Sequence, residues 1–227
     1  MPGSAAQTAT SSGRETPSAA APGYVRRFGA GERALHWLLA GTFLTMLVSG
    51  LVLYLPSLAT LAADRVLWKS VHLGAAIAFW CGLVALLPGN ARALRATARE
   101  IDRFDDDDRR WLAWAVHHRG PEPPQGRFNA GQKLNAAIVA GLLVVFTASG
   151  TLMYLQEADA GFRGTSAILV HDIATWVAVP IVCGHLYLAL VNPSTRHSLR
   201  GMLLGSVRRD WAERHHPKWR PDEPPPR

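Results

Sequence analysis

The chain has 227 residues, of which 24 are Lys or Arg and 17 are Asp or Glu, so its net charge is +7 at pH 7. Its pI is near 10.1 and its mean hydropathy is +0.06. A soluble domain spreads its apolar residues along the chain, but here they collect in four long blocks with almost no charge. This distribution argues against an ordinary soluble protein.

The four apolar blocks predict four membrane-spanning helices. Each is close to, or longer than, the roughly 20 residues that a helix needs to cross the bilayer core. We place the spans at about 34–54, 66–88, 133–155 and 164–191. Asp172 is the single acid within the fourth block, and the others hold no charge over 34–54, 70–88 and 134–155. The expected fold class is all-α, an integral membrane four-helix bundle with a cytoplasmic middle loop and short surface helices.

Two polar tails flank the predicted membrane domain, which covers residues 24–220. Residues 1–23 are rich in Ala, Ser, Thr, Gly and Pro and contain no apolar stretch long enough for a signal peptide. Residues 221–227 are also polar and rich in Pro. Both segments bury too little apolar surface to order themselves, so we expect disordered tails.

The basic residues indicate how the chain is oriented. Three arginines lie in 26–33, eight in 92–127, and seven Lys or Arg in 196–220. The loops on the other side hold only Arg65, Lys69 and Arg163. Because cytoplasmic loops are enriched in positive charge, both termini and the middle loop of this multi-pass membrane protein are predicted to be cytoplasmic. The basic excess is a topology signal, and we expect no nucleic acid partner.

The chain also contains an internal repeat. Residues 27–55 align without gaps on residues 127–155, with ten identities in 29 positions, and each copy begins with Arg-Phe-x-Ala-Gly. In the spans that follow, Val71-His72 corresponds to Val170-His171. The repeat predicts two related helical hairpins that form the bundle together.

Four of the nine histidines lie in the spans. A histidine in a membrane helix is costly and by default indicates a functional site. His36 lies near the cytoplasmic start of the first span, whereas His72 and His171 lie near the outer starts of the second and fourth. His185 follows His171 by 14 residues, which is about 21 Å and nearly four turns of helix, so both share one face at opposite depths.

These depths predict two histidine pairs, His36 with His185 at the inner level and His72 with His171 at the outer level. Two imidazoles facing each other across a bundle suit the axial positions of haem iron. Zinc would need further ligands, and no Asp, Glu or Cys completes either pair. Without a Cys-x-x-Cys-His motif, covalent haem attachment is excluded, so two haems b are expected. Hydrogen bonds between helices and a proton path are the alternatives.

Other residues near these histidines have two interpretations each. Arg33 and Lys69 each lie three residues before a predicted ligand and are candidate partners of haem propionates, although basic residues are common at membrane interfaces. Glycines within the spans would leave room for a flat macrocycle or let helices pack closely. These are Gly41, Gly50, Gly74, Gly82, Gly141, Gly150 and Gly184. The pairs at 117–118 and 215–216 are interpreted as surface or interface histidines.

Two motifs resemble a known family. They are Arg-Phe-Asn-Ala-Gly-Gln-Lys at 127–133 and Trp-Ala-Glu-Arg-His-His-Pro-Lys-Trp at 211–219. Together with the four spaced histidines, they make residues 24–220 similar to the gamma subunits, cytochromes b556, of membrane-bound formate dehydrogenases. The histidine spacing alone fits several dihaem cytochromes b, whereas the two motifs are more selective.

The resemblance implies a function. In that family, an alpha subunit with a molybdenum or tungsten cofactor oxidises formate outside, and an iron–sulfur beta subunit passes the electrons to the gamma subunit. The resemblance assigns the outer haem to His72 and His171, the inner haem to His36 and His185, and reduction of ubiquinone or menaquinone to the cytoplasmic side. It places the quinone near Asn129, Gly131 and Gln132. The chain itself would transfer electrons and would not oxidise formate.

Several alternatives stay open at this point. Asn129-x-x-Gln132 is also the pattern of a capping box at a helix N-terminus. The same bundle and haem plan serve the cytochrome b of a hydrogenase or thiosulfate reductase, and a free-standing cytochrome b561-like superoxide oxidase. A transporter is disfavoured because Asp172 is the only acid in the spans.

Overall fold

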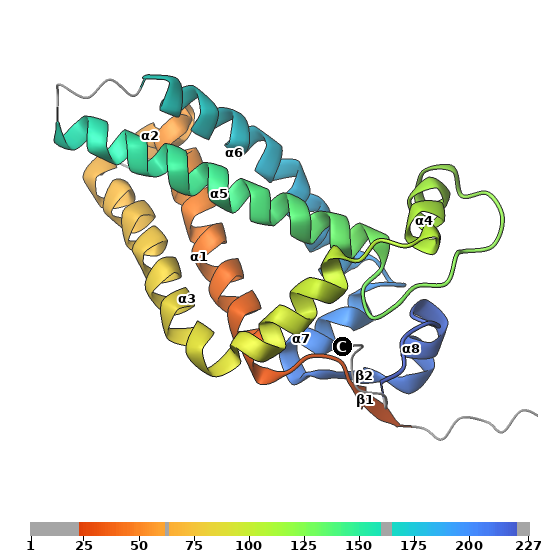
Figure 1. The fold of residues 1–227 in the computed structure, drawn as a ribbon. Helices are drawn as coiled ribbons and strands as arrows, with labels where there is room; N and C mark the ends of the chain where they lie inside the picture. Colours follow the sequence, from red (N-terminus) through yellow and green to blue (C-terminus); the bar gives the residue numbers. More distant parts are fainter. Residues whose placement is uncertain (1–22, 62–63, 160–164, 222–227) are drawn as a thin grey trace, which may run out of the picture.

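The computed structural model describes residues 23–61, 64–159 and 165–221. Its long helices are α1 (Ala30–Tyr54), α3 (Arg65–Asp102), α5 (Ala130–Ala158) and α6 (Thr165–Leu186) (Figure 1). Helix α6 continues as a π-helical turn, η1 (Tyr187–Val191). Helix α1 packs mainly on α3, and α5 mainly on α6, so the bundle consists of two hairpins. All four helices are long and apolar enough to cross a membrane, which confirms the predicted fold class.

The long helices turn most of their apolar surface outward. Within the most apolar 18-residue window of each helix, only 6–11% of the residues are buried. Such exposure suits a lipid environment and would be unfavourable in water. A small buried cluster of Leu142, Ala174 and Ala178 lies between α5 and α6. Phe43 of α1 packs against it together with Phe146 and Ile181, so the first hairpin contacts the second here.

Helix α3 is longer than the predicted second span. It does not end near residue 88 but contains Pro88 and continues to Asp102. Its last turns are held from the side by Arg127, which contacts the Thr97 hydroxyl at 2.9 Å and the Glu100 carboxylate at 2.7 Å. The start of the predicted middle loop, where the sequence indicates a short surface helix, is therefore a continuation of α3, stabilised by the segment before α5.

Short elements gather at one end of the bundle. They include α4 (Asp106–His117), η2 (Arg196–Ser198), α7 (Leu199–Leu204) and α8 (Arg209–His215), whereas α2 (Pro56–Leu61) lies at the other end (Figure 1). Strand β1 (Tyr24–Arg26) pairs antiparallel with β2 (Ser206–Arg208), an element that the sequence did not predict. The pairing joins the two ends of the described chain. The predicted tails lie outside the described residues, apart from Gly23 and Pro221.

The two Arg-Phe-x-Ala-Gly motifs contact each other directly. Arg27 Nη2 donates to the carbonyl oxygen of Arg127 at 2.7 Å, and Arg127 Nη1 donates to the carbonyl oxygen of Arg27 at 3.0 Å. The rings of Phe28 and Phe128 lie 5.9 Å apart. The repeated motif thus forms a reciprocal clasp between the two hairpins.

The two arginines of the clasp have different partners. Arg127 forms ion pairs with Glu32 at 2.9 Å and Glu100 at 2.7 Å. Arg27 is 3% exposed, and no carboxylate among the described residues lies within ion-pair distance of it. Burial, followed by the positive charge of Arg127, lowers the pKa of Arg27. The clasp therefore contains one cation with carboxylates at ion-pair distance, Arg127, and one, Arg27, that is influenced by the more distant negative charge of Glu100.

His216 was interpreted as a surface or interface residue, and the structure places it inside this clasp, at an interface between segments. It is 3% exposed, and its Nδ1 donates to the carbonyl oxygen of Gly126 at 2.6 Å. Its Nε2 then accepts from Arg27 Nη2 at 3.1 Å. Burial and the adjacent Arg27 cation lower the pKa of His216 to about 3, so the ring is neutral at physiological pH.

Acidification should loosen this end of the bundle. Between pH 6.5, the ordinary pKa of histidine, and about pH 3, an unfolded His216 binds a proton that the folded ring excludes. Stability is therefore lost as the pH falls through this window, by at most about 1.4 kcal/mol per pH unit. Melting temperatures measured from pH 7 to pH 4 should fall less steeply in His216→Gln than in the wild type. His117→Gln, at an exposed position, is the control, and equal slopes in all three proteins would refute the assignment.

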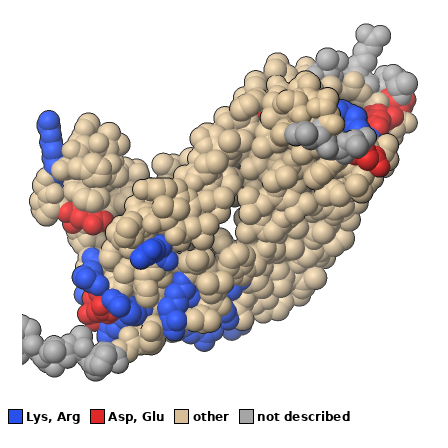
Figure 2. All heavy atoms as spheres, turned by 180° about the vertical axis from the view of Figure 1, so that it is seen from behind, with Lys and Arg blue, Asp and Glu red and all other residues tan. Residues whose placement is uncertain are grey.

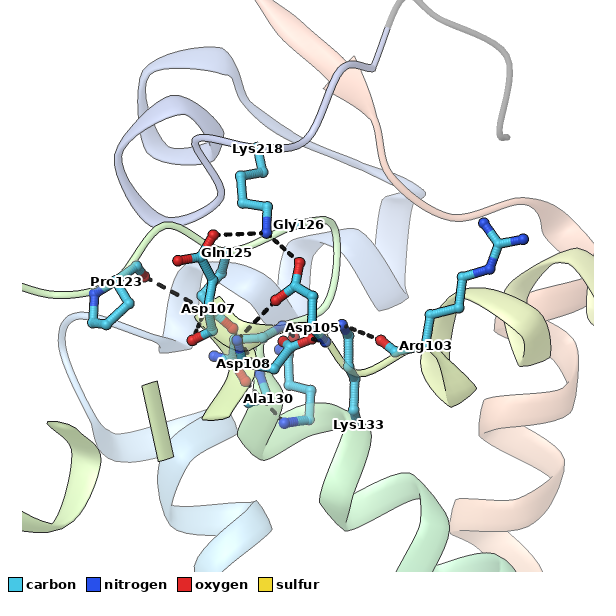
Figure 3. A network of polar contacts seen from close by, with 12 residues as sticks. Arg103, Asp105, Asp107, Asp108, Pro123, Gln125, Gly126, Ala130, Lys133 and Lys218 are labelled. Atoms are coloured by element: carbon cyan, nitrogen blue, oxygen red, sulfur yellow. Dashed lines mark hydrogen bonds and ion pairs between the residues drawn. The ribbon is translucent and has the colours of Figure 1, made fainter. Parts of the chain in front are cut away.

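A second network docks α4 on the start of α5 (Figure 3). Lys133 Nζ lies 2.6 Å from the Asp108 carboxylate, with both side chains at most 10% exposed. Lys218 forms ion pairs with Asp105 and Asp107. The hydrogen bond from Lys218 lowers the pKa of Asp105 to about 2. These contacts tie the middle loop, the third span and the C-terminal segment into one unit.

Candidate functional site

Two histidine pairs connect helices across the bundle. His36 on α1 and His185 on α6 have ring centroids 6.3 Å apart. His72 on α3 and His171 on α6 have ring centroids 6.2 Å apart. The structure therefore brings together the two pairs that the predicted depths suggested, with one end of α6 in each pair.

The spacing of both pairs fits a single iron between the rings. A metal–imidazole bond is about 2 Å long and a ring centroid lies about 1.1 Å behind its nitrogen, so two ligands on opposite sides of one metal have centroids roughly 6 Å apart. Within the described residues, no group of three or more His, Cys, Asp or Glu is placed to hold a metal ion. Two-fold imidazole ligation suits haem iron and leaves a zinc site incomplete.

Each ring of the outer pair is held by a serine. Ser49 Oγ lies 3.0 Å from His72 Nδ1, and Ser149 Oγ lies 2.9 Å from His171 Nδ1. Both hydroxyls donate their proton to a carbonyl oxygen four residues earlier, at 2.7 Å. They therefore accept from an imidazole Nδ1–H, and Nε2 keeps the lone pair that a metal requires.

Sequence reasoning missed a role for these serines. The available signal was the Ser-Gly identity at 49–50 and 149–150 in the repeat alignment. The neighbouring glycines lie against the same rings, since a Cβ on Gly50 or Gly150 would be in van der Waals contact with Cε1 of the adjacent histidine, at 3.4 or 3.5 Å. Each Ser-Gly pair thus provides a hydrogen-bond acceptor for one imidazole ring and a backbone surface in contact with it.

The other glycines of the spans either serve close helix packing or leave room for a macrocycle. A Cβ on Gly82 would lie 2.7 Å from Leu38, so this glycine serves close packing of α1 on α3. Four others would meet no described atom within 4 Å and border open space, as a macrocycle cradle requires. These are Gly41, Gly74, Gly141 and Gly184.

Aromatic side chains lie between the two pairs. Phe43 and Phe146 have ring centroids 5.9 Å apart, and Phe146 lies with its centroid 5.0 Å from that of His171. They pack against residues of α6 that come between His171 and His185 in the chain. An apolar layer therefore separates the inner from the outer level.

The two propionate candidates already have protein partners. Arg33 Nη1 donates to the carbonyl oxygen of Leu203 at 2.9 Å. Lys69 on α3 forms an ion pair with Glu157 on α5. Their contact with haem propionates stays a prediction.

The three quinone candidates lie at the start of α5. Asn129 Oδ1 accepts from Gln132 N at 2.8 Å, and Gln132 Oε1 accepts from Asn129 N at 3.1 Å, which confirms the capping box. Gln132 Oε1 also accepts from Arg27 Nη2 at 3.4 Å. A Cβ on Gly131 would lie 3.0 Å from the Trp111 ring of α4, so any larger residue would require this ring to shift by a few tenths of an ångström.

Comparison with known proteins decides the family. The sequence profile of the prokaryotic cytochrome b561 family matches residues 27–205. The chain belongs to this family. A cytochrome b carries haem b, so the two histidine pairs of this cytochrome are its candidate axial ligands.

Relatives of this cytochrome b include subunits of formate dehydrogenases, which confirms the resemblance seen in the sequence. The cytochrome b556(Fdn) subunit of the nitrate-inducible enzyme of Escherichia coli is 25% identical over 195 residues, 83% of this chain and 86% of that one. The cytochrome b556(fdo) subunit of Escherichia coli is 26% identical over 206 residues, 85% and 90% of the two chains. The cytochrome b556 subunit of Haemophilus influenzae formate dehydrogenase is 25% identical over 198 residues, 84% and 80%.

Proposed function

We propose that this cytochrome is the membrane-anchoring dihaem subunit of a formate dehydrogenase and delivers electrons to a quinone. The observation that carries the proposal is the pair of cross-bundle histidine sites with centroids 6.3 and 6.2 Å apart. When bound, haem b would supply a one-electron carrier at each level. His72 and His171 would hold the outer group, and His36 and His185 the inner one.

The charge distribution supports the orientation of this path. Lys and Arg gather at the end of the bundle that carries the short elements, whereas the surface of the long helices is largely uncharged (Figure 2). By the positive-inside rule that end is cytoplasmic, together with both termini. Electrons from an iron–sulfur subunit outside would then reach the His72/His171 level first and the His36/His185 level second. Protease access to both tails from the outside of intact cells would contradict this orientation.

Partner identity can be tested by isolation from native membranes. A tagged chain should co-purify with an iron–sulfur subunit and a molybdenum- or tungsten-containing catalytic subunit, and the preparation should reduce quinone with formate. Recovery of a hydrogenase or thiosulfate reductase subunit instead would replace formate dehydrogenase in the proposal. Isolation of the chain alone, with activity towards superoxide, would refute it.

The quinone role of Asn129 can be separated from its capping role. Ser caps a helix about as well as Asn but is shorter and lacks the amide, whereas Ala costs about 0.5–2 kcal/mol as a cap. If Asn129 contacts the quinone, both Asn129→Ser and Asn129→Ala should reduce quinone slowly or with a raised KM, and their haem spectra should be normal. Near-normal quinone reduction in Asn129→Ser, together with slow reduction in Asn129→Ala, would show that Asn129 acts only as a helix cap.

A further inference from the structure

The inner and outer histidine pairs differ in what their rings contact. Both outer rings donate from Nδ1 to a serine hydroxyl, at 3.0 Å for His72 and 2.9 Å for His171. In the described part of the chain, no hydrogen bond from His36 or His185 accompanies their ring contacts, which are with Trp37 and with each other. The imidazoles at the two levels therefore differ in electronic environment.

The hydrogen bonds between the two serines and the histidine rings are shielded from water and well oriented. Ser49 is 0% and Ser149 is 3% exposed, so water does not compete for the imidazole proton. Each hydroxyl is oriented by its own bond to a backbone carbonyl at 2.7 Å, which leaves an oxygen lone pair for the ring. Hydrogen bonds in such a low-dielectric setting are stronger than in water. The same serine–histidine hydrogen bond occurs in both repeats, and among the described residues it is found only at the His72/His171 level.

A hydrogen bond from Nδ1–H makes a ligand imidazole more electron-rich. The opposite nitrogen then becomes a better donor to its metal. A stronger donor stabilises ferric over ferrous iron, and hydrogen bonding beyond the ligands is one of the means by which proteins set haem potentials. Two such bonds on one haem act in the same direction.

We propose that Ser49 and Ser149 are positioning residues that lower the reduction potential of the outer haem relative to the inner haem. Transfer from the outer to the inner level is then downhill, which suits electrons that arrive from outside and leave to a quinone at the cytoplasmic side. The inference rests on the proposed dihaem function, since it concerns the ligands of that haem.

The test is a potentiometric measurement on the purified dihaem protein. Ser49→Ala and Ser149→Ala should each raise the potential of the outer haem, and the double variant should raise it most, while the inner potential stays in place. We expect the double variant to shift the distribution of an electron between the two haems roughly tenfold towards the outer one, which is about 59 mV for a one-electron couple. The infrared band of the ligand imidazoles, which reports Nδ1–H bonding, should shift in parallel.

Controls separate this effect from general damage. Thr147→Ala removes a hydroxyl that donates to the Leu143 carbonyl at 2.7 Å on the same helix as Ser149, without a histidine contact, and should move neither potential. Ser149→Thr keeps a hydroxyl and should keep the low potential. If the double variant loses haem, the single variants still test the proposal, because each retains one bond and should show part of the shift.

The outcomes distinguish this inference from the proposed function. Two haems with unchanged potentials and unchanged imidazole bands in the serine variants would overturn the inference and leave the dihaem function standing. An equal rise of both potentials would also overturn it. A wild-type protein that binds fewer than two haems would instead refute the proposed function.

Discussion

Replacing His185 by Ala should remove the inner haem and lower quinone reduction at least tenfold, while the outer haem stays and is still reduced by its donor. The reason is the geometry of the pairs, because His185 faces His36 at 6.3 Å and its loss leaves one imidazole at that level. The outer pair, at the other end of α6, keeps both of its rings. His36→Ala should have the same effect.

Haem content and reduction kinetics in purified membranes provide the measurement. His117→Ala, an exposed histidine outside both pairs, is the control and should behave as the wild type. Loss of the outer haem alone in His185→Ala would contradict the pairing. Normal quinone reduction in a protein that has lost the inner haem would contradict the electron path.

The second large effect concerns the two arginines of the clasp, whose replacement by Met should have unequal consequences. Arg127→Met leaves the carboxylates of Glu32, 11% exposed, and Glu100, 32% exposed, without their cation. Breaking a fully buried ion pair costs about 3–5 kcal/mol, and because these side chains are only partly buried, the cost here should lie below that range. Arg27→Met removes bonds to Arg127 and His216 but also removes a buried cation that has no carboxylate partner at ion-pair distance in the described residues.

Thermal unfolding of the two variants, at equal haem content, tests this difference. Arg127→Met should lower the melting temperature clearly more than Arg27→Met. Because Arg27 donates to Gln132 and Arg127 donates to the carbonyl oxygen of Arg27, quinone kinetics should be measured as well. A larger loss of stability in Arg27→Met would show that the ion pairs of Arg127 do not dominate the clasp.

The spans and the histidine pairing could be predicted because both depend on regular periods. Apolar length identifies a membrane helix, and the 14 residues between His171 and His185 place both on one helical face. The capping box at Asn129 was likewise readable as a short local pattern. These features need no knowledge of distant contacts.

The features that were missed depend on partners far along the chain. The β1–β2 pair joins three-residue strands, Tyr24–Arg26 and Ser206–Arg208, that no hairpin turn connects. The continuation of α3 beyond Pro88 is held by Arg127, and His216 is enclosed by Gly126, Arg27 and Trp211. The roles of Ser49 and Ser149 likewise appear only once a histidine on another helix lies beside each.

The most direct test of the account is the haem content of the purified chain after full reconstitution. Two haems b per chain are expected, both with the reduced-minus-oxidised spectrum of low-spin iron ligated by two histidines, and each pair of His→Ala variants should remove one of them. A content that stays at zero or one haem per chain would contradict the two-site account.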